Sequence, residues 1–273
     1  MPKTGHVPPT HAELLPIATE AVDRAAHMVR ERPAGQVTMK SDRDPATEVD
    51  YAVEREIRDF LAARAPDVDF LGEEEGQFGS SASGFTWALD PVDGTVNFIH
   101  DIPLCGVSLG LVHDAHPVLG VIDLPFLNLR YSAMLGGGAY RGTERIHVSD
   151  ARRLSEAVIA IGDYATGEGA DLKNAERIRI TQRLASSVER VRMFGSAAVD
   201  LAWVAEGRIA GSVMLANKPW DVTAGVLLAR EAGAEVIDRH GRRHRLGSES
   251  TVAVTPALRD DLVTLLDDLS PVA

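Results

Sequence analysis

The chain has 273 residues, of which 45% are hydrophobic and 25% charged, so it is long enough and apolar enough to build a full globular core. Its 28 basic and 40 acidic residues give a net charge of −12. A phosphate backbone or an anionic membrane binds a basic face, so we expect neither a nucleic acid nor a membrane among its partners.

Three further features bear on where the protein works. No segment approaches the roughly 18 consecutive apolar residues that span a bilayer. Residues 1–9, which we expect to form a flexible arm, lack the apolar run of a secretory signal peptide. The single cysteine, Cys105, excludes an internal disulfide, and its apolar neighbours predict a buried thiol. These features favour a cytoplasmic protein.

Two helices are predicted near the start of the chain. Thr10 and Glu13 have the spacing of a capping box, and apolar residues recur after them at helical spacing. Pro16 falls inside this pattern, so the first helix is expected to be kinked or to start later. A second helix is predicted to begin at Thr47, with Asp50 three residues on.

Short β-prone runs follow the second predicted helix. They cover residues 67–71, 85–89, 104–112, 117–124 and 129–135. The last three are separated by breaks of turn length, which predicts antiparallel pairing.

The second half of the chain mixes strands and helices. Strands are predicted at 158–161, near Val191 and at 235–237, and helices at 172–187, 197–205, 221–232 and from Pro256 onward. A weak boundary between two structural lobes is predicted near residue 150. We therefore expect an α/β fold of layered helices and sheets in two closely packed lobes, residues 10–150 and 151–273.

The most informative motif is W-A-L-D-P-V-D-G-T-V-N-F at residues 87–98. A hydrophobic strand runs directly into Asp90 and Asp93, and carboxylates at a strand end can hold hard divalent cations. Gly94 permits a backbone conformation that other residues avoid, and the N–H groups of Gly94 and Thr95 would face an anion if they open a helix. A plain surface turn is the alternative, because Asp, Pro and Gly are common turn residues.

Two other segments place carboxylates next to a predicted strand or helix. The run F-L-G-E-E-E-G at residues 70–76 places Glu73 and Glu74 after a short strand and a glycine. Its alternative is a solvated acidic surface. In K-P-W-D-V-T-A-G at residues 218–225, Asp221 would cap a helix, and a simple N-cap is the alternative.

Taken together, the motifs G-E-E, W-x-x-D-P-x-D-G-T-x-N-F and P-W-D-x-x-A-G resemble those of the inositol monophosphatase family of lithium-sensitive, metal-dependent phosphatases. The resemblance covers nearly the whole chain and includes A-T-E-V-D at 46–50 and G-S-A-A-V at 195–199. It implies a Mg²⁺-dependent hydrolase that acts on a small phosphate monoester, such as inositol monophosphate or a related sugar or polyol phosphate. It also implies alternating helix and sheet layers, and a homodimer.

The resemblance also assigns roles to residues. Two or three Mg²⁺ ions would be held by Glu73, Asp90, the main-chain carbonyl of Val92, Asp93 and Asp221, with Asp90 bridging two of the ions. Asp50 and Thr95 would orient the attacking water, and Glu74 would lie in the outer shell. The amides of Gly94 and Thr95 would bind the phosphate. The rest of the substrate would face Gly195, Ser196, Ala197, Met214 and Asp221.

Such an arrangement suits phosphoryl transfer, because two metal ions stabilise both ends of an in-line displacement. Metal ions also acidify water, which agrees with the absence of histidine from these motifs. One position departs from the family pattern. Inositol-hydrolysing members carry a ring-contacting glutamate seven residues before the W-D aspartate, and this chain has Met214 there. The substitution puts myo-inositol 1-phosphate in doubt as the substrate.

Other functions remain to be weighed. A haloacid-dehalogenase-type phosphatase would need D-x-D-x-T, and Pro91 occupies the first position, so we reject that class. Within the family, the substrate could instead be histidinol phosphate, fructose 1,6-bisphosphate, a 3′-phosphoadenosine nucleotide or an intermediate of specialised metabolism. A non-catalytic metal-binding member is a further alternative.

Three remaining signals are interpreted as structural. His113 and His116 are expected in a hairpin loop, solvated and without a metal. Residues 136–138, G-G-G, lack the lysine of a phosphate-binding loop and predict a strand turn. The basic segment 239–245 is expected to form an exposed turn after a strand.

Overall fold

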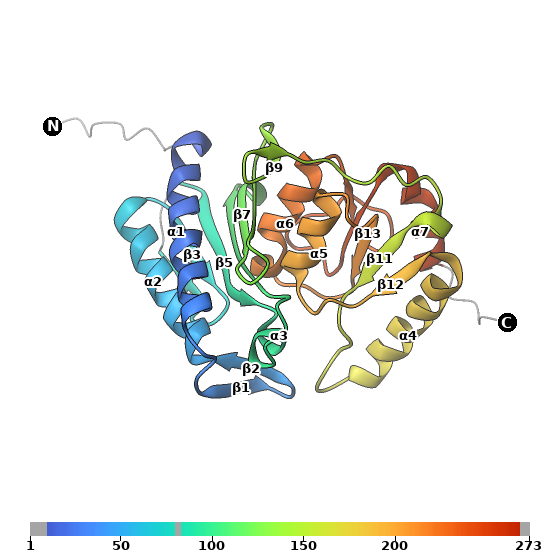
Figure 1. Cartoon of the computed structure of the whole chain (residues 1–273), viewed down its shortest axis with the longest axis horizontal. Helices are drawn as coiled ribbons and strands as arrows, with labels where there is room; N and C mark the ends of the chain where they lie inside the picture. Colours follow the sequence, from blue (N-terminus) through green and yellow to red (C-terminus); the bar gives the residue numbers. More distant parts are fainter. Residues whose placement is uncertain (1–9, 80–82, 268–273) are drawn as a thin grey trace.

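A computed structural model of the chain describes residues 10–79 and 83–267, and the predicted arm at residues 1–9 lies outside these ranges. Helices and sheets alternate in five layers (Figure 1). The expectation of an α/β fold with alternating layers is confirmed. No helix in the described part of the chain is long and apolar enough to cross a membrane.

The two predicted N-terminal helices are present as α1 (His11–Glu31) and α2 (Glu48–Arg64). The capping box of α1 forms, because the backbone N–H of Thr10 donates to Oε2 of Glu13 at 2.8 Å. Pro16 lies within α1, so the helix does not start after the proline.

A hairpin that the sequence did not predict joins these helices. It consists of β1 (Val37–Ser41) and β2 (Asp44–Thr47), which pair antiparallel. Val37 and Met39 alternate with Thr38 and Lys40 along β1, but every residue of the strand is exposed, so this short alternation marks no buried face.

The first large sheet has eight strands in the order β10-β9-β8-β7-β6-β5-β3-β4. The strands are β3 (Asp69–Gly72), β4 (Gln77–Phe78), β5 (Phe85–Asp93), β6 (Gly106–His113), β7 (His116–Leu124), β8 (Leu129–Met134), β9 (Gly138–Arg141) and β10 (Glu144–Arg145). Strands β6, β7 and β8 pair antiparallel as predicted, whereas β3 and β5 are parallel. A short helix, α3 (Thr95–Ile99), follows β5.

The second sheet has five strands in the order β12-β11-β13-β15-β14. The strands are β11 (Val158–Ile161), β12 (Arg190–Arg192), β13 (Gly211–Met214), β14 (Glu235–Ile237) and β15 (Thr251–Val254). The helices of this half are α4 (Ala170–Ser187), α5 (Ala197–Ala205), α6 (Pro219–Glu231) and α7 (Arg259–Asp267), with 3₁₀ turns η1 (Leu154–Glu156) and η2 (Pro256–Leu258). The chain changes sheet between β10 and β11, near residue 150, and the division into two lobes stays a prediction.

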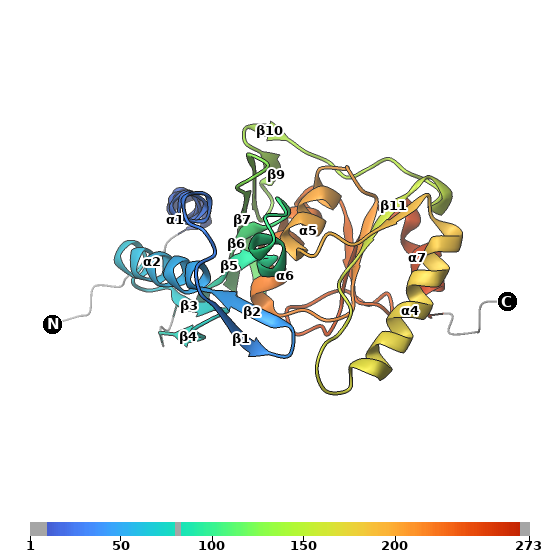
Figure 2. The same cartoon turned by 60° about the horizontal axis from the view of Figure 1, so that its bottom comes forward.

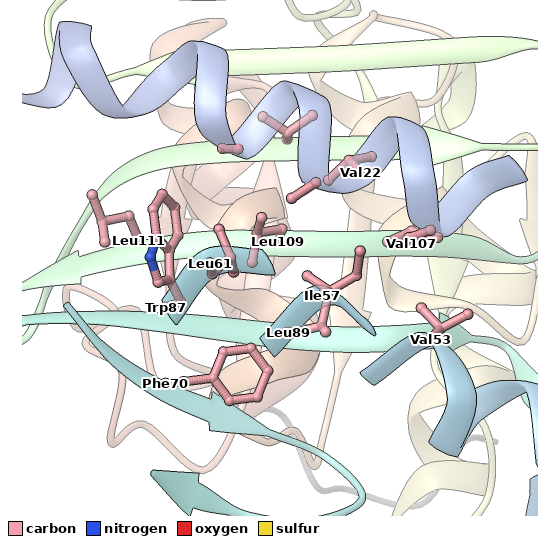
Figure 3. Packing of buried hydrophobic residues seen from close by; sticks show 14 of the residues in the cluster. Val22, Val53, Ile57, Leu61, Phe70, Trp87, Leu89, Val107, Leu109 and Leu111 are labelled. Atoms are coloured by element: carbon pink, nitrogen blue, oxygen red, sulfur yellow. The ribbon is translucent and has the colours of Figure 1, made fainter. Parts of the chain in front are cut away.

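Each helix pair covers a sheet face through its apolar side. Helices α1 and α2 pack on the outer face of the large sheet, where Ile57 of α2 meets strand residues such as Trp87 and Leu109 (Figure 3). Burying one such side chain stabilises the fold by about 1.5–3 kcal/mol. Helices α5 and α6 fill the space between the two sheets, and α4 and α7 cover the far face of the smaller one.

Two glycines let α6 lie unusually close to the large sheet. Gly110 of β6 and Gly120 of β7 are partners in register. A Cβ at Gly110 would lie 2.3 Å from the side chain of Thr223, and one at Gly120 would lie 2.8 Å from the backbone of Ala224. This close approach places the first turn of α6, with Asp221, beside the end of β5.

Candidate active site

The predicted residues converge on one cavity of about 330 Å³ between the two halves of the chain. Of the predicted site residues, those that line it are Glu73, Asp90, Val92, Asp93, Gly94, Thr95, Gly195, Ser196, Ala197, Met214 and Asp221. Asp50 and Glu74 lie behind this lining. The motifs are far apart in sequence, and the ends of β3, β5 and β13 bring them together with the first turns of α5 and α6.

The end of β5 is irregular where its two aspartates emerge. Asp90 pairs with Ser108, but Asp93 pairs with Gly106, so β5 contains one extra residue between the two pairs. Such a bulge bends a strand and redirects its side chains. Asp90 and Asp93 are both buried, and the N–H of Val92 donates to Oδ1 of Asp90 at 3.1 Å.

The turn after β5 requires a glycine. Gly94 has a φ of 88°, in the left-handed region, and a Cβ there would lie 3.0–3.2 Å from Leu104 O, Gly195 O and Ser196 Cβ. Asn97 fastens this turn to the second half of the chain, because its Nδ2 donates to the carbonyls of Leu104 and Phe194 at 2.7 Å each. Asn97 belongs to the predicted motif, but the sequence did not reveal this role.

Asp93 is held at the start of α5. Its Oδ2 accepts from the hydroxyl of Ser196 at 2.6 Å and from the N–H of Ala198, and its Oδ1 accepts from the N–H of Ala197 at 3.2 Å. Burial raises the pKa of Asp93 to about 6, while these three donors act in the opposite direction. Ser196 and Ala197 therefore position Asp93 in this structure, and their expected contact with substrate stays a prediction.

Asp50 and Thr95, predicted to act together, are in contact. Asp50 closes the capping box of α2, with its Oδ2 accepting from the N–H of Thr47 at 2.9 Å and from the hydroxyl of the same residue. The hydroxyl of Thr95 lies 3.0 Å from Oδ1 of Asp50 and 3.0 Å from the carbonyl oxygen of Val92. Burial raises the pKa of Asp50, and its hydrogen bonds counteract the shift.

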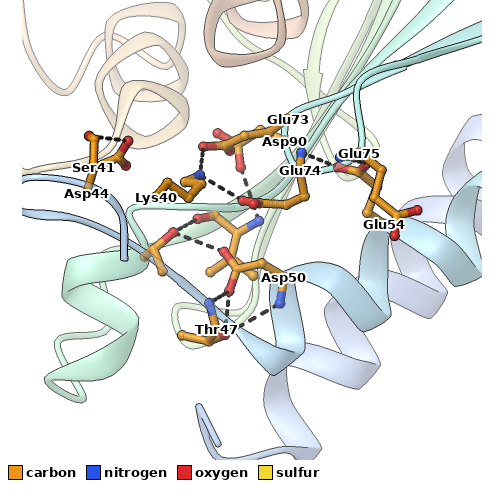
Figure 4. A network of polar contacts seen from close by, with 12 residues as sticks. Lys40, Ser41, Asp44, Thr47, Asp50, Glu54, Glu73, Glu74, Glu75 and Asp90 are labelled. Carbon is orange, nitrogen blue, oxygen red and sulfur yellow. Dashed lines mark hydrogen bonds and ion pairs between the residues drawn. The ribbon is translucent and has the colours of Figure 1, made fainter. Parts of the chain in front are cut away.

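Lys40 reaches from the β1–β2 hairpin to the acidic run after β3 (Figure 4). Its Nζ lies 2.7 Å from Oε1 of Glu73 and 2.9 Å from Oε1 of Glu74. The Glu74 side chain is fully buried, and its Oε2 has no hydrogen-bond partner among the described residues. Burial raises the pKa of Glu74 to about 7, with Lys40 acting against the shift.

The cavity concentrates negative charge. Burial raises the pKa of Asp90 well above its usual value, and the neighbouring carboxylates of Glu73, Asp93 and Asp221 raise it further. Burial likewise raises the pKa of Asp221 to about 7. Closely spaced carboxylates of this kind are stabilised in the charged form by a bound cation.

Comparisons with known proteins identify the family of this chain. Residues 10–270 match the family model described as "Inositol monophosphatase family". The chain belongs to the inositol monophosphatase family. The probable inositol 1-monophosphatase ImpA of Mycobacterium tuberculosis is 34% identical over 239 residues, which is 86% of this chain and 87% of the relative. A fructose-1,6-bisphosphatase/inositol-1-monophosphatase of Thermotoga maritima is 32% identical over 227 residues, covering 83% and 84%.

Solved structures show the same fold. The extragenic suppressor protein suhB of Bartonella henselae superposes with a TM-score of 0.89 at 31% identity, covering 94% of this chain and 99% of that chain. The inositol monophosphatase of Anabaena gives a TM-score of 0.86 at 31% identity, covering 96% and 98%. As a member of this family, the chain is a phosphatase that hydrolyses phosphoric monoesters.

Sequence reasoning missed four charged residues of the cavity. They are Asp44, Asp163, Arg177 and Asp200. Asp163 follows Gly162 directly after a buried strand, which is the pattern that identified Glu73 after Gly72. Arg177 lies on the buried face of α4 with Ile180 and Leu184, so an arginine in an apolar helical stripe was the available signal.

Asp200 is buried in the first turn of α5. The hydroxyl of Ser212 lies 3.1 Å from its Oδ2, while its Oδ1 has no partner among the described residues. Burial raises its pKa to about 8, and the hydrogen bond from Ser212 acts against the shift.

Three other predictions concern residues outside the cavity. Cys105 is buried, as predicted. His113 and His116 end β6 and begin β7 on either side of a two-residue turn, and His113 stacks on Phe85 at 4.0 Å. Residues 136–138 form the β8–β9 turn, whose Gly136 and Gly138 amides donate to Glu231 at 2.8 Å.

Proposed function

We propose that this cavity is the active site of a Mg²⁺-dependent phosphatase that hydrolyses a small phosphate monoester by direct attack of water. The observation that carries the proposal is the clustering of Glu73, Asp90, Asp93 and Asp221 on one cavity wall. Their negative charge is incompletely compensated, and the Gly94–Thr95 turn lies beside them.

The donor set fits Mg²⁺, which prefers carboxylate and carbonyl oxygens. Glu73, Asp90 and the carbonyl of Val92 would hold one ion, and Asp90, Asp93 and Asp221 a second. When bound, the ions would neutralise phosphate charge and lower the pKa of a water molecule. As the side chains stand, no three His, Cys, Asp or Glu residues of the described ranges converge on one metal position.

Protein donors engage several of these oxygens. Lys40 pairs with Glu73, and the N–H of Lys218 donates to Oδ2 of Asp221 at 2.7 Å. Metal binding would therefore be accompanied by rotation of these two carboxylates. Lys40 would then neutralise Glu74, consistent with an outer-shell place for Glu74.

The remaining residues would handle phosphate and water. The amides of Gly94 and Thr95 would bind phosphoryl oxygens, which carry developing charge during transfer. The hydroxyl of Thr95, held by Asp50, would orient the attacking water in line with the leaving oxygen. Gly195, Ser196, Ala197, Met214 and Asp221 would border the leaving group.

The proposed substrate class rests on the names of the relatives and on position 214, where this chain departs from the family pattern. Relatives are named inositol-1-monophosphatase or fructose-1,6-bisphosphatase/inositol-1-monophosphatase, which supports a sugar or polyol phosphate. Met214 is only 4% exposed and lines the cavity, so an apolar side chain stands where the family pattern has a carboxylate. We infer that inositol 1-phosphate is hydrolysed, but less well than another small phosphate ester. Histidinol phosphate and 3′-phosphoadenosine nucleotides remain alternatives.

The direct test is phosphate release from a panel of phosphate monoesters with Mg²⁺ and with EDTA. Activity with Mg²⁺ that EDTA abolishes is expected. Hydrolysis of a phosphate monoester made chiral at phosphorus with oxygen isotopes should then invert the configuration, because water attacks phosphorus in a single step. Retention of configuration would indicate a covalent phosphoenzyme and contradict direct attack, and complete inactivity on the panel would favour a non-catalytic member. A cytoplasmic location and a homodimer stay predictions.

A further inference from the structure

A buried glutamate of α2 lies against the acidic run that follows β3. Glu54 is fully buried, and no basic side chain of the described ranges forms an ion pair with it. Figure 2 shows α2 beside β3 and β4, which residues 73–76 connect. A buried carboxylate without a cation is unfavourable unless hydrogen-bond donors satisfy its oxygens. The donors that reach Glu54 therefore indicate what it does.

Two consecutive backbone N–H groups are these donors. The N–H of Glu74 donates to Oε2 of Glu54 at 2.8 Å, and the N–H of Glu75 donates to Oε1 at 2.7 Å (Figure 4). Successive N–H groups of a turn form a concavity that binds an anion. Among side chains, only a carboxylate offers two equivalent acceptor oxygens to such a pair. Burial raises the pKa of Glu54, and these two hydrogen bonds act against the shift.

The two glycines of the G-E-E-E-G run fit the loop to this carboxylate. The N–H of Gly72 donates to the carbonyl oxygen of Gly76 at 2.9 Å, and Gly76 has a φ of 84°, in the left-handed region. A Cβ at Gly72 would overlap the carboxyl carbon and both oxygens of Glu54. Gly76 thus closes the loop, and Gly72 leaves room for the side chain that holds it.

The loop sends its acidic side chains in different directions. Glu73 lines the active-site cavity. Glu75 does not line it and instead pairs with two residues of α2, with Arg55 at 2.6 Å and with Arg58. The backbone that separates these two side chains is the stretch that Glu54 binds. The direction of Glu73 therefore depends on this contact.

Helix α2 carries both Glu54 and Asp50. The two residues lie four positions apart, so their side chains leave the same face of the helix. Asp50 binds the hydroxyl of Thr95, which is proposed to orient the attacking water. Glu54 binds the loop that carries Glu73. One helix thereby sets the position of the water-orienting pair relative to that of a proposed metal ligand.

We propose that Glu54 is a positioning residue of the metal site, whose carboxylate holds the backbone of residues 74 and 75 so that Glu73 faces the cavity. This inference rests on the proposed Mg²⁺-dependent function and adds to it a residue that touches neither metal nor substrate. Loss of a group that orients a metal ligand typically lowers metal affinity by roughly 10- to 100-fold.

Metal binding in the absence of substrate tests this role. Mn²⁺ takes the same oxygen ligands as Mg²⁺, and electron paramagnetic resonance measures the free ion. Glu54→Gln keeps one acceptor oxygen but places an amino group against a backbone N–H. Its Kd for Mn²⁺ should be roughly 10- to 100-fold higher than that of the wild type. Amide hydrogen exchange of residues 72–76 should also be faster in the metal-free variant.

Variants of the same helix separate positioning from stability. Glu56→Gln breaks an exposed ion pair with Arg24, and Ile57→Val removes a buried methyl group from the core. Neither change touches the hydrogen bonds of the loop, so both variants should bind Mn²⁺ like the wild type. Glu54→Asp keeps two acceptor oxygens on a shorter side chain and should recover part of the affinity that Glu54→Gln loses.

Gly72→Ala tests the same contact from the loop side. The added methyl group overlaps Glu54, so this variant should also weaken Mn²⁺ binding. Glu54→Asp shortens the side chain and makes room for the methyl group. Gly72→Ala should therefore cost less Mn²⁺ affinity in the Glu54→Asp background than in the wild type. This pair keeps the inference testable if Glu54→Gln does not fold.

The outcomes separate this inference from the phosphatase function. Wild-type Mn²⁺ affinity in a folded Glu54→Gln variant, or an equal loss in Ile57→Val, would overturn the positioning role and leave the phosphatase intact. An equal effect of Gly72→Ala in both backgrounds would overturn it as well. Absence of Mg²⁺-dependent hydrolysis of every monoester by the wild type would contradict the phosphatase function itself, and Mn²⁺ binding and amide exchange would still decide the role of Glu54.

Discussion

Ser196 donates its hydroxyl hydrogen to Oδ2 of Asp93 at 2.6 Å, and the two residues come from different halves of the chain. The same hydroxyl accepts from the N–H of Val199 at 3.2 Å, so Ser196 both caps α5 and orients a proposed metal ligand. The start of α5 is thereby tied to the end of β5.

Replacing Ser196 with Ala should weaken Mg²⁺ binding more than it weakens the fold. Loss of a partner that orients a metal ligand typically lowers metal affinity by roughly 10- to 100-fold. Loss of an N-cap hydroxyl lowers stability by about 1 kcal/mol. The Mg²⁺ concentration that gives half-maximal activity should rise accordingly. Ser196→Thr keeps the hydroxyl and should remain near wild type, and an unchanged Mg²⁺ dependence in Ser196→Ala would contradict this role.

The metal-free protein should lose stability as pH rises from 6 to 8. Burial raises the pKa of Glu74 and of Asp221 to about 7 and that of Asp200 to about 8. Above about pH 5 and up to these pKa values, the folded state retains protons that the unfolded state has already released. The free energy of unfolding therefore falls with rising pH, by up to about 1.4 kcal/mol per pH unit for each group.

Thermal unfolding with EDTA and with Mg²⁺ at several pH values checks this expectation. Mg²⁺ stabilises the charged carboxylates, so it should raise the melting temperature more at pH 8 than at pH 6. If the melting temperature of the metal-free protein instead rises from pH 6 to pH 8, these groups are already ionised in the folded state at pH 6.

Met214→Glu should raise activity on inositol 1-phosphate. A carboxylate at this cavity position could accept a hydrogen bond from a ring hydroxyl, which corresponds to roughly 10- to 150-fold in kcat/KM. The variant should also be less stable, because position 214 is almost fully buried. Met214→Leu keeps the apolar wall and serves as the control. If Met214→Glu leaves the ratio of inositol 1-phosphate to other substrates unchanged, residue 214 does not reach the substrate.

His244 should make the protein sensitive to acid. Its Nε2 lies 2.9 Å from the hydroxyl of Thr251, which donates to Oδ1 of Asn217, so the neutral imidazole is the donor. Burial lowers the pKa of His244 to about 4. Between about pH 6.5 and 4 the unfolded state binds the extra proton, so stability falls as pH falls.

His244→Gln isolates this contribution. The variant should be less stable than wild type at pH 7, and the gap in free energy of unfolding should be about 2 kcal/mol narrower at pH 5. Chemical denaturation of both proteins at the two pH values measures the gap. A gap that is constant with pH would mean that His244 is not buried in its neutral form.

Local signals predicted much of this molecule. The capping boxes at Thr10 and Thr47 and the apolar periodicity after them depend on neighbours within a few residues, and both helices formed where expected. The carboxylate motifs were found because a buried strand ending in Asp90 or Glu73 is visible in the sequence alone. Their convergence on one cavity rested on the family resemblance.

The features that were missed depend on tertiary contacts. Lys40 lies on a short strand whose residues are all exposed, and its pairing with Glu73 spans 33 residues. Arg177 reaches the cavity because α4 packs beside the turn that carries Asp163, and the sequence does not show this packing. No signal in the neighbouring sequence distinguishes a serine that binds Asp93 from a serine that only caps a helix.

The central claim is that Asp90 bridges two Mg²⁺ ions in a phosphatase site, and the kcat/KM of Asp90→Asn at saturating Mg²⁺ tests it most directly. Two-metal stabilisation is worth several kcal/mol of the barrier, so the loss should be at least about 10³-fold. Glu75→Gln is the control, because Glu75 belongs to the same acidic run but pairs with Arg55 and Arg58 outside the cavity. Near-normal activity of a folded Asp90→Asn variant would contradict the account.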